Sequence, residues 1–319
     1  MLDAVVVGAG QSGLAVSYYL RKYGASFVVL DASDEPGGAW PHYWDALTLF
    51  SRAEFSNLPG WSMPHYDGYP PRDHVVKYLS RYEQRYSLPI RRGEHVKHVL
   101  HDGSAFHLNS FSARNVVMAT GIWSAPFVPF VPGTSAGQQL HAASYRRPSD
   151  FAGQRVAVVG GGNSGAQIVA DLGLNGVDAQ WFTRRPPSFM PDDVDGAQLF
   201  RRNRERFVAI ARGEGDPGGA DFGGDIVVVP EVHRARAQGL LDASPMPASL
   251  DSLADFDALI WATGFRPALS PVRSLELGLD TPGLFVLGFD SLNGPGAGTI
   301  GGVSPFARDI AKQIVGIDQ

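Results

Sequence analysis

The chain has 319 residues, of which 44% are hydrophobic and 18% are charged, and its formal net charge is −5 at pH 7. This length predicts two domains and a sizeable core, and the acidic balance argues against a basic nucleic-acid-binding surface. Cysteine is absent, which excludes disulfides, cysteine-bound zinc, iron–sulfur clusters and a thiolate nucleophile. Any redox chemistry must therefore come from a bound cofactor.

The start of the chain lacks the features of a targeting segment. An apolar run begins at once, without preceding basic residues, and no apolar run in the chain approaches the roughly 20 residues of a membrane span. We therefore expect a soluble, cytoplasmic protein whose partners are small molecules rather than nucleic acids or membranes. We leave open whether it acts as a homodimer.

The N-terminal segment has the pattern of a strand, a glycine-rich turn, a helix and a second strand. Residues 4–7 form a short apolar run, as expected for a strand buried on both faces of a parallel sheet. The loop that follows, Gly8–Gly13, has the sequence G-A-G-Q-S-G and precedes a helical pattern. The next apolar run, residues 27–30, ends at Asp31, which lies 18 positions after the last glycine of the loop.

The same pattern recurs in the middle of the chain. Residues 156–159 form an apolar run, the loop Gly160–Gly165 has the sequence G-G-G-N-S-G, and a helical pattern leads to a strand at 179–182. An Ala-Thr-Gly segment also occurs twice after apolar runs, at 119–121 and at 262–264. Two copies of both motifs at similar offsets predict an α/β fold with two Rossmann-like dinucleotide-binding domains.

Both glycine loops have the context that a nucleotide-binding loop requires. A strand before the loop and a helix after it direct backbone N–H groups and the positive end of the helix toward a pyrophosphate. The first glycine allows the tight turn, the second lets the phosphates approach, and the third lets the helix pack on the strand. The alternative for each loop is a tight turn that binds nothing.

The two loops differ in the residue that follows the second strand. Asp31 is placed to accept hydrogen bonds from ribose hydroxyls and would repel a 2′-phosphate, which suits FAD or NAD. The matching position in the second copy holds Thr183, followed by Arg184 and Arg185. Two guanidinium groups can bind a 2′-phosphate, so NADPH is favoured, although NADH and two merely solvated arginines remain alternatives. Together the sites predict hydride transfer to a flavin.

The sequence resembles the flavin-containing monooxygenases, especially the short bacterial members, over essentially its full length. The resemblance is carried by both glycine loops, both Ala-Thr-Gly segments, the segment Pro36–Trp40 and the spacing Gly137-x₃-His141-x₃-Tyr145. The last resembles the family motif F-x-G-x-x-x-H-x-x-x-(F/Y), although Ser135 replaces its phenylalanine. Tyr145 fits this family better than it fits the related Baeyer–Villiger monooxygenases, which have a tryptophan at this position of the motif.

The resemblance implies an NADPH domain inserted into a FAD domain, with residues 1–122 and 255–319 forming the FAD domain and 123–254 the NADPH domain. It also implies the residues that border each cofactor. For FAD these are Gly8, Gly10, Gln11, Ser12, Gly13, Asp31, Gly37, Gly38, Trp40, Val96, Ala119, Thr120, Gly121, Asp290 and Ile300. For NADPH these are Gly160, Gly162, Asn163, Ser164, Gly165, Thr183, Arg184, Arg185 and Thr263.

The resemblance further implies a reaction in which NADPH reduces FAD and O₂ forms a flavin C4a-hydroperoxide. This species would oxygenate a soft nucleophile such as a sulfide or an amine, with ketones less favoured. Phe50, Ser51 and Asn57 are candidates to line the flavin, and the catalytic residue is not identified. No metal site is expected, because His95, His98 and His101 lie where Val96 and Val99 predict a strand.

Two other functions remain open. One is an NADPH-dependent flavoprotein reductase that passes electrons to a protein acceptor without inserting oxygen. The other is a non-enzymatic binding protein that responds to nucleotides.

Overall fold

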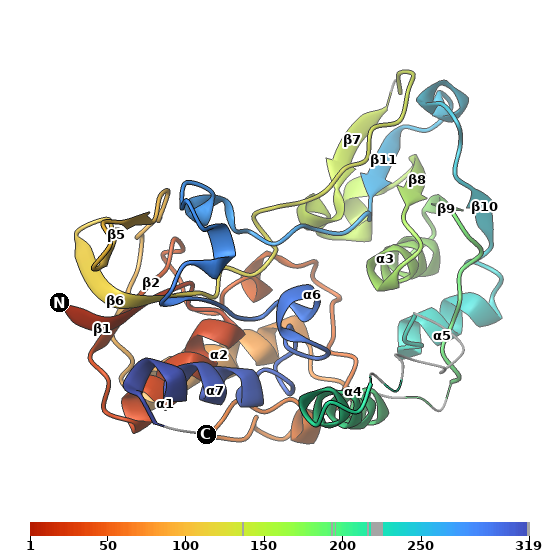
Figure 1. The fold of residues 1–319 in the computed structure, drawn as a ribbon. Coiled ribbons are helices and arrows are strands. Elements are labelled where there is room, and N and C mark those ends of the chain that lie inside the picture. The colour runs from red at the N-terminus through yellow and green to blue at the C-terminus, as the bar shows by residue number, and fades with distance from the viewer. Residues whose placement is uncertain (136, 193, 195, 216, 218–225, 318–319) are drawn as a thin grey trace.

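The structure is a computed structural model that describes residues 1–135, 137–192, 194, 196–215, 217 and 226–317. It has two lobes, each built around its own sheet, and the chain passes from the first lobe to the second and back (Figure 1). Both sheets have parallel strands at their centre, with helices packed against them. The predicted α/β fold with two Rossmann-like sheets is therefore confirmed.

The first sheet has the strand order β3-β2-β1-β6-β5-β4, with β12 also paired to β6. Its strands are β1 (Leu2–Val7), β2 (Phe27–Leu30), β3 (Ile90–Arg91), β4 (Leu100–His101), β5 (Phe106–Leu108), β6 (Phe111–Met118) and β12 (Leu284–Val286). β1, β2, β3, β6 and β12 pair in parallel, whereas β4 and β5 are antiparallel additions. The carboxyl ends of the parallel strands therefore meet at one edge, where ligands bind in such folds.

Helices cover one face of the first sheet. They are α1 (Gln11–Lys22), α2 (Arg72–Arg85) and α7 (Ser304–Val315), and the short α6 (Asp290–Asn293) precedes α7. Ala4 and Val6 of β1 contribute to the core on this helical face, whereas Val5 and Val7 contribute to the core on the other face. All four are buried, which explains why β1 is a continuous apolar run rather than an alternating one.

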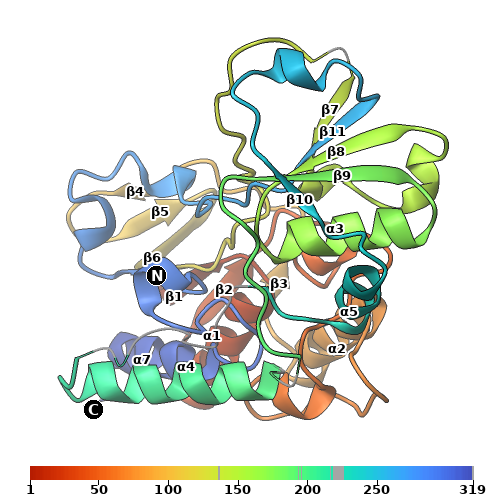
Figure 2. The ribbon, with the colours of Figure 1, turned by 90° about the vertical axis from the view of Figure 1, so that its right-hand side faces the viewer.

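The second sheet has the strand order β10-β9-β8-β11-β7, and all its pairs are parallel. Its strands are β7 (Gln138–His141), β8 (Arg155–Val159), β9 (Asp178–Thr183), β10 (Ala243–Pro245) and β11 (Ala258–Trp261). The helices α3 (Asn163–Leu174) and α5 (Pro230–Ala237) pack against each other beside it. α4 (Gly196–Ala211) instead lies at the level of α1 and α7 of the first lobe (Figures 1 and 2).

Short 3-10 helices occupy several connections in the described part of the chain. They are η1 (Trp40–His42), η2 (Ala53–Phe55), η3 (Ala142–Ser144), η4 (Pro148–Phe151), η5 (Leu250–Leu253), η6 (Ser270–Val272) and η7 (Gly278–Asp280).

Two expectations need correction. β11 pairs with β7 and β8 of the second sheet, so the expected return to the first domain at residue 255 lies too early. The strand expected around Val96 and Val99 is wrong as well. Both valines are buried, but residues 94–99 form no strand pairing with the described part of the chain; the N–H of Val99, for example, donates to the carbonyl of Pro271 at 2.9 Å. The division of the chain into two domains stays a prediction.

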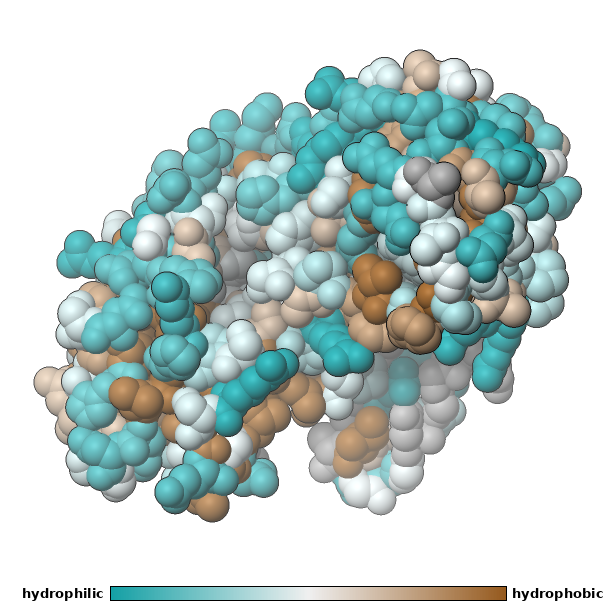
Figure 3. All heavy atoms as spheres, turned by 90° about the horizontal axis from the view of Figure 1, so that it is seen from above, coloured by the Kyte–Doolittle hydropathy of each residue, from teal (hydrophilic) through white to brown (hydrophobic). Residues whose placement is uncertain are grey.

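Seen from above, hydrophilic residues cover much of both lobes, and hydrophobic residues gather in small groups (Figure 3). None of the helices among the described residues has the length and apolar character needed to cross a bilayer.

Candidate functional site

The first glycine loop forms a tight connection between β1 and α1, here called the first cradle (Gly8–Gly13). Gly8 has φ +103°, and a Cβ there would lie 2.5 Å from the carbonyl oxygen of Ala119. A Cβ on Gly13 would lie 1.8 Å from the carbonyl oxygen of Gly8. At Gly10, by contrast, the nearest atom to an added Cβ is 3.8 Å away. The outer glycines are thus required by packing, whereas Gly10 leaves open space at the start of α1.

Asp31 lies at the end of β2 beside the first cradle and is buried. Its Oδ2 accepts a hydrogen bond from the N–H of Ala9 at 2.5 Å, and its Oδ1 accepts one from the N–H of Ser33 at 2.8 Å. Each oxygen has a further lone pair with which to accept a ribose hydroxyl. The acceptor oxygens of Asp31 beside the first cradle therefore fit a nucleotide without a 2′-phosphate, as FAD requires.

The segment Pro36–Trp40 closes the side of the first cradle. Gly38 has φ +60°, and a Cβ there would lie 2.6 Å from the Cα of Gly10. Gly37 is also left-handed, at φ +111°. The backbone can approach the cradle this closely only because position 38 is glycine, and the left-handed backbone at position 37 also favours glycine.

Gln11 connects three parts of the first lobe. Its Oε1 accepts a hydrogen bond from Nε1 of Trp40 at 3.0 Å, and its Nε2 donates to the carbonyl of Gly298 at 2.6 Å. The N–H of Gly298 in turn donates to Oδ1 of Asp290 at 2.6 Å. The N-terminus of α1, the Pro36–Trp40 segment and the loop before α7 therefore share one hydrogen-bond chain.

The other residues predicted to border FAD occupy different surroundings. Ser12 is buried, and a Cβ on Gly288 would lie 2.3 Å from its Oγ. Val96 is buried in the core on the side of the first sheet opposite α1, and Ile300 is buried in the core beneath the helices. Their roles toward FAD stay predictions.

The second glycine loop, here called the second cradle (Gly160–Gly165), repeats the first in detail. Gly160 has φ +139°, and a Cβ there would lie 2.1 Å from the carbonyl oxygen of Ala262. A Cβ on Gly165 would lie 2.1 Å from the carbonyl oxygen of Gly160, which also accepts a hydrogen bond from Nε1 of Trp181 at 2.7 Å. An added Cβ on Gly162 meets nothing described within 4 Å. The middle glycine again leaves space at a helix N-terminus.

The end of β9 places the predicted 2′-phosphate residues at the surface. Thr183 is buried, whereas Arg184 and Arg185 are exposed and form no ion pair with the described residues. Asn163, the first residue of α3, accepts a hydrogen bond through Oδ1 from the N–H of Val227 at 2.9 Å, and Ser164 follows it, partly buried. The two guanidinium groups are thus available to an anionic ligand.

The two Ala-Thr-Gly segments join the lobes. The hydroxyl of Thr120 donates to the carbonyl of Ala268 at 2.8 Å, and that of Thr263 donates to the carbonyl of Phe127 at 2.5 Å. The chain crosses from the first lobe to the second after Thr120 and returns after Thr263. Thr120 therefore bonds to the returning connection, and Thr263 bonds to the outgoing one. The N–H of Ala268 also donates to the carbonyl of Gly121 at 2.9 Å. A role of Thr120 and Thr263 in holding the crossing segments together was not visible in the sequence.

His141 bonds to one of these crossing segments. Its Nδ1 accepts a hydrogen bond from the N–H of Ala143 at 3.1 Å, so Nε2 carries the proton and donates to the carbonyl of Gly264 at 2.9 Å. Burial lowers the pKa of His141 below its usual value. Gly137 begins the same motif, and a Cβ there would lie 2.4 Å from the carbonyl oxygen of Phe256. The geometry therefore explains both the glycine and the histidine of the motif.

We expect the protein to lose stability as the pH falls below about 6.5. The unfolded histidine gains a proton near this pH, whereas the folded His141 has a lower pKa and stays neutral, so acid favours the unfolded state. The contribution is fully present above pH 7 and is lost on acidification. Urea unfolding of the wild type and of His141→Asn at pH 8 and pH 5.5 measures it. The stability difference between the two proteins should shrink at pH 5.5; a constant difference would contradict the assignment.

Aromatic side chains fill the junction between the lobes. Trp123 and Phe265, which follow the two Ala-Thr-Gly segments, have ring centroids 5.5 Å apart, and the ring of Tyr43 lies 4.5 Å from that of Trp123. Trp44 is buried in the core of the second lobe, beside Tyr145. The signal for this cluster was present in the sequence, since each Ala-Thr-Gly segment is followed within two residues by an aromatic residue.

Tyr145, the last residue of the family motif, is fully buried. Its hydroxyl donates to Oδ2 of Asp171 at 2.7 Å. Burial raises the pKa of both groups, and the two side chains share one hydrogen bond within the second lobe. Tyr145 therefore supports the second core.

The candidates for lining the flavin lie on one loop of the first lobe. The carbonyl of Phe50 accepts a hydrogen bond from the N–H of Gly196 at 3.0 Å, and the buried Ser51 bonds to Ser56 with an Oγ–Oγ distance of 2.7 Å. Asn57 donates through Nδ2 to the carbonyl of Glu54 at 2.7 Å and accepts through Oδ1 from the N–H of Met63 at 2.8 Å. Both ends of its amide are engaged within this loop, and the placement of Phe50, Ser51 and Asn57 beside the flavin stays a prediction.

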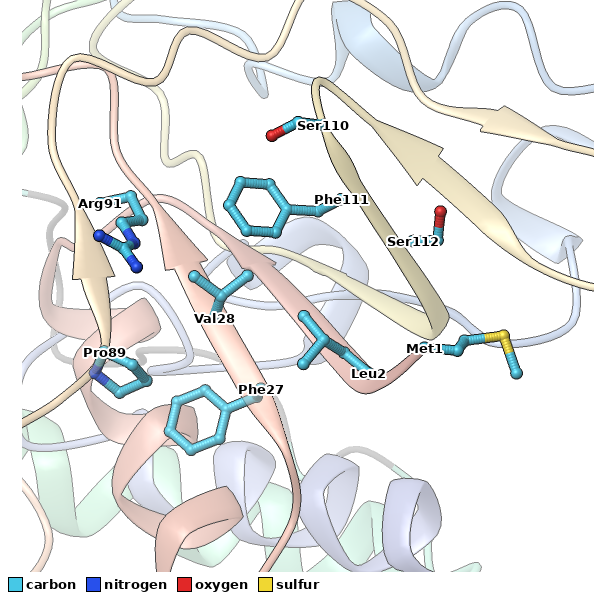
Figure 4. A pocket seen from close by; sticks show the side chains of 9 residues that line it. All are labelled: Met1, Leu2, Phe27, Val28, Pro89, Arg91, Ser110, Phe111 and Ser112. Atoms are coloured by element: carbon cyan, nitrogen blue, oxygen red, sulfur yellow. The ribbon is translucent and has the colours of Figure 1, made fainter.

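A pocket of about 530 Å³ lies away from both cradles (Figure 4). Its lining includes Leu2, Phe27 and Phe111, the first residues of β1, β2 and β6. It therefore lies at the amino-terminal edge of the first sheet, opposite the edge that carries the first cradle. Among the described residues, no group of three or more histidine or acidic side chains could hold a metal ion.

Comparison with known proteins agrees with this architecture. Residues 5–287 match the family model described as pyridine nucleotide-disulphide oxidoreductase. The flavin-containing monooxygenase from Stenotrophomonas maltophilia is 41% identical, with a TM-score of 0.87 over 99% of this chain and 98% of that one. Cyclohexanone monooxygenase, at 19% identity and a TM-score of 0.66, shares the fold.

Curated relatives match over shorter stretches. The uncharacterized oxidoreductase CzcO of Bacillus subtilis is 35% identical over 54% of this chain and 52% of its own length, and the indole-3-pyruvate monooxygenase YUCCA1 of Oryza sativa subsp. japonica is 34% identical over 62% and 51%. The chain thus spans about half the length of these relatives. Taken with the full-length match above, the chain belongs to the pyridine nucleotide-disulphide oxidoreductase fold family and, among its enzymes, to the flavin-containing monooxygenases.

Proposed function

We propose that the chain is an NADPH-dependent monooxygenase that holds FAD in the first cradle and NADPH in the second. The observation that carries this proposal is the pair of cradles in one chain, each with an open middle glycine at a helix N-terminus. They differ where the cofactors differ, because Asp31 follows β2 while Arg184 and Arg185 follow β9. The division into an FAD domain and an inserted NADPH domain is part of the proposal.

The residues of the chain bind and orient rather than react. The first N–H groups of α1 and α3 have no partners within their helices and are directed at the phosphates. Asp31 would accept hydrogen bonds from the ribose hydroxyls of FAD, and Arg184 and Arg185 would bind the 2′-phosphate of NADPH. FAD, when bound, supplies hydride acceptance and O₂ activation, which no side chain can provide. Trp123, Phe265 and their aromatic neighbours exclude water from the junction between the lobes.

The substrate class we propose is a small, soft nucleophile, namely a sulfide or an amine, with ketones as a secondary class. The absence of cysteine supports oxygen transfer rather than disulfide reduction as the reaction of this chain. The 319 residues contain no cysteine, so the chain has no thiol of its own to exchange with a disulfide.

Isotope labelling tests the proposed function. Methyl phenyl sulfide, a tertiary amine and cyclohexanone serve as probes with NADPH and ¹⁸O₂, and products are read by mass spectrometry. We expect one ¹⁸O atom in the sulfoxide or N-oxide for each NADPH consumed, in excess over the lactone. NADPH oxidation that releases hydrogen peroxide in full and labels no product would overturn the proposal in favour of a reductase. A purified protein that binds no flavin would point to the binding protein.

Replacing Arg184 and Arg185 together by glutamine should raise the KM for NADPH at least tenfold and leave that for NADH unchanged. Each charge-assisted hydrogen bond contributes about 1.5–3 kcal/mol, and NADH lacks the phosphate that receives them. Steady-state NAD(P)H oxidation measures both constants. The double lysine variant, which keeps the charge but loses the fork of donors, should lie in between. Unchanged constants in the glutamine variant would refute the 2′-phosphate site.

A further inference from the structure

Three charged side chains meet at the adenosine end of the first cradle. Asp31 comes from the end of β2, Arg92 directly follows β3, and Glu83 projects from α2. Nη2 of Arg92 donates to Oε2 of Glu83, and Nη1 of Arg92 lies 3.4 Å from Oδ1 of Asp31. The three side chains are only 8–21% exposed. One guanidinium is therefore shared between two largely buried carboxylates.

The contact between Arg92 and Asp31 supplies charge rather than a hydrogen bond. Nη1 of Arg92 is buried and has no hydrogen-bond acceptor among the described residues. The oxygens of Asp31 already accept from the N–H groups of Ala9 and Ser33. A buried carboxylate without a compensating charge is unfavourable, and a buried N–H without an acceptor is unfavourable as well. Arg92 supplies the compensating charge to Asp31, and its buried Nη1 stays at this carboxylate without making a hydrogen bond of its own to the described residues.

The surroundings hold Arg92 in this place. The N–H of Gly93 donates to the carbonyl of Ser33 at 3.3 Å, and the N–H of Glu94 donates to the carbonyl of Asp31 at 2.9 Å. Burial raises the pKa of Glu83, the charge of Asp31 raises it further, and Arg92 opposes both effects. The guanidinium is thus fixed by its own backbone on one side and by Glu83 on the other.

We propose that Arg92 is a positioning residue that sets the affinity of the first cradle for the adenosine half of FAD. The charge of its Nη1, which lies 3.4 Å from Oδ1 of Asp31, holds the Asp31 carboxylate in the orientation that the ribose hydroxyls require. This inference rests on the proposed FAD site and adds a residue to it that none of the motifs contains.

The test measures binding rather than turnover. Apoprotein saturated with NADP⁺, which fills the second cradle, is titrated with FAD, and bound FAD is then displaced by ADP or by 2′-deoxy-ADP. We expect Arg92→Gln to weaken FAD at least tenfold and to abolish the preference for ADP over its deoxy analogue. Arg92→Lys should restore part of both. In an Asp31→Asn background, Arg92→Gln should add little further loss, because the two residues act as one unit.

Arg91→Gln is the matched control, because the side chain of this neighbouring arginine is exposed and lines the pocket of Figure 4, whereas only its backbone carbonyl, which the substitution keeps, bonds to Asp31. It should bind FAD and ADP as the wild type does. Glu83→Gln provides a second variant should Arg92→Gln fail to fold, and it should change FAD affinity in the same direction. The inference would be overturned if Arg92→Gln kept the wild-type affinity for FAD and the preference for ADP over 2′-deoxy-ADP. It would also be overturned if the losses of affinity in the Asp31→Asn, Arg92→Gln double variant were additive. Either result would leave the proposed function intact. A wild-type protein that binds no FAD would overturn both.

Discussion

Replacing Gly10 by alanine is expected to abolish tight FAD binding while leaving the protein folded. Gly10 has φ −75° and ψ −174°, a conformation that alanine adopts without strain, and an added Cβ meets its nearest atom at 3.8 Å. The methyl group would instead occupy the open space at the start of α1, where the pyrophosphate must approach the backbone. We expect at least a hundredfold loss in FAD affinity, read from the flavin content of the purified protein and from titration of the apoprotein.

The neighbouring glycines provide the contrast for this prediction. Gly13→Ala would place a methyl 1.8 Å from the carbonyl oxygen of Gly8, so this variant should be destabilised whether or not a cofactor is present. Gly10→Ala should instead keep the circular dichroism and the urea midpoint of the wild-type apoprotein. A Gly10→Ala protein that purifies with a full complement of FAD would show that the first cradle is not where the pyrophosphate binds.

Much of the fold could be predicted because its signals are local. β1 and β8 each end in four buried apolar residues, and each is followed directly by a glycine that only a tight βα turn explains. Local signals also explain the error at β11, which the expected boundary at residue 255 placed in the first lobe. A buried parallel strand has the same sequence character in either sheet, and only its pairing with β7 and β8 decides where it belongs.

The parts of the site that escaped prediction depend on residues distant in the chain. Thr120 bonds to Ala268, which lies 148 positions away, and Thr263 bonds to Phe127, 136 positions away. The Asp31–Arg92 contact likewise needs the ends of β2 and β3 to meet. Sequence spacing identifies the glycine loops because their geometry is contained in six residues, but it carries no information on such long-range pairs.

Gly162→Ala should separate the two cradles functionally. An added Cβ at this position meets no described atom within 4 Å, and φ is −100° in the glycine, so the fold should tolerate the methyl group as it does at Gly10. Here, however, FAD should remain bound with its normal spectrum. The KM for NADPH should rise at least tenfold, because the methyl blocks the approach of the second pyrophosphate to the N-terminus of α3.

Anaerobic mixing with NADPH, followed by the bleaching of the flavin absorbance, measures this effect directly. Dithionite, which needs no nucleotide site, should reduce the wild type and the Gly162→Ala variant alike and serves as the control. If Gly162→Ala loses FAD as Gly10→Ala does, the cradles are not independent sites. If NADPH reduces the variant at the wild-type rate and concentration dependence, the nicotinamide cofactor binds elsewhere. Only a variant that keeps its flavin yet is reduced slowly by NADPH agrees with two cradles that hold different cofactors and exchange a hydride between them.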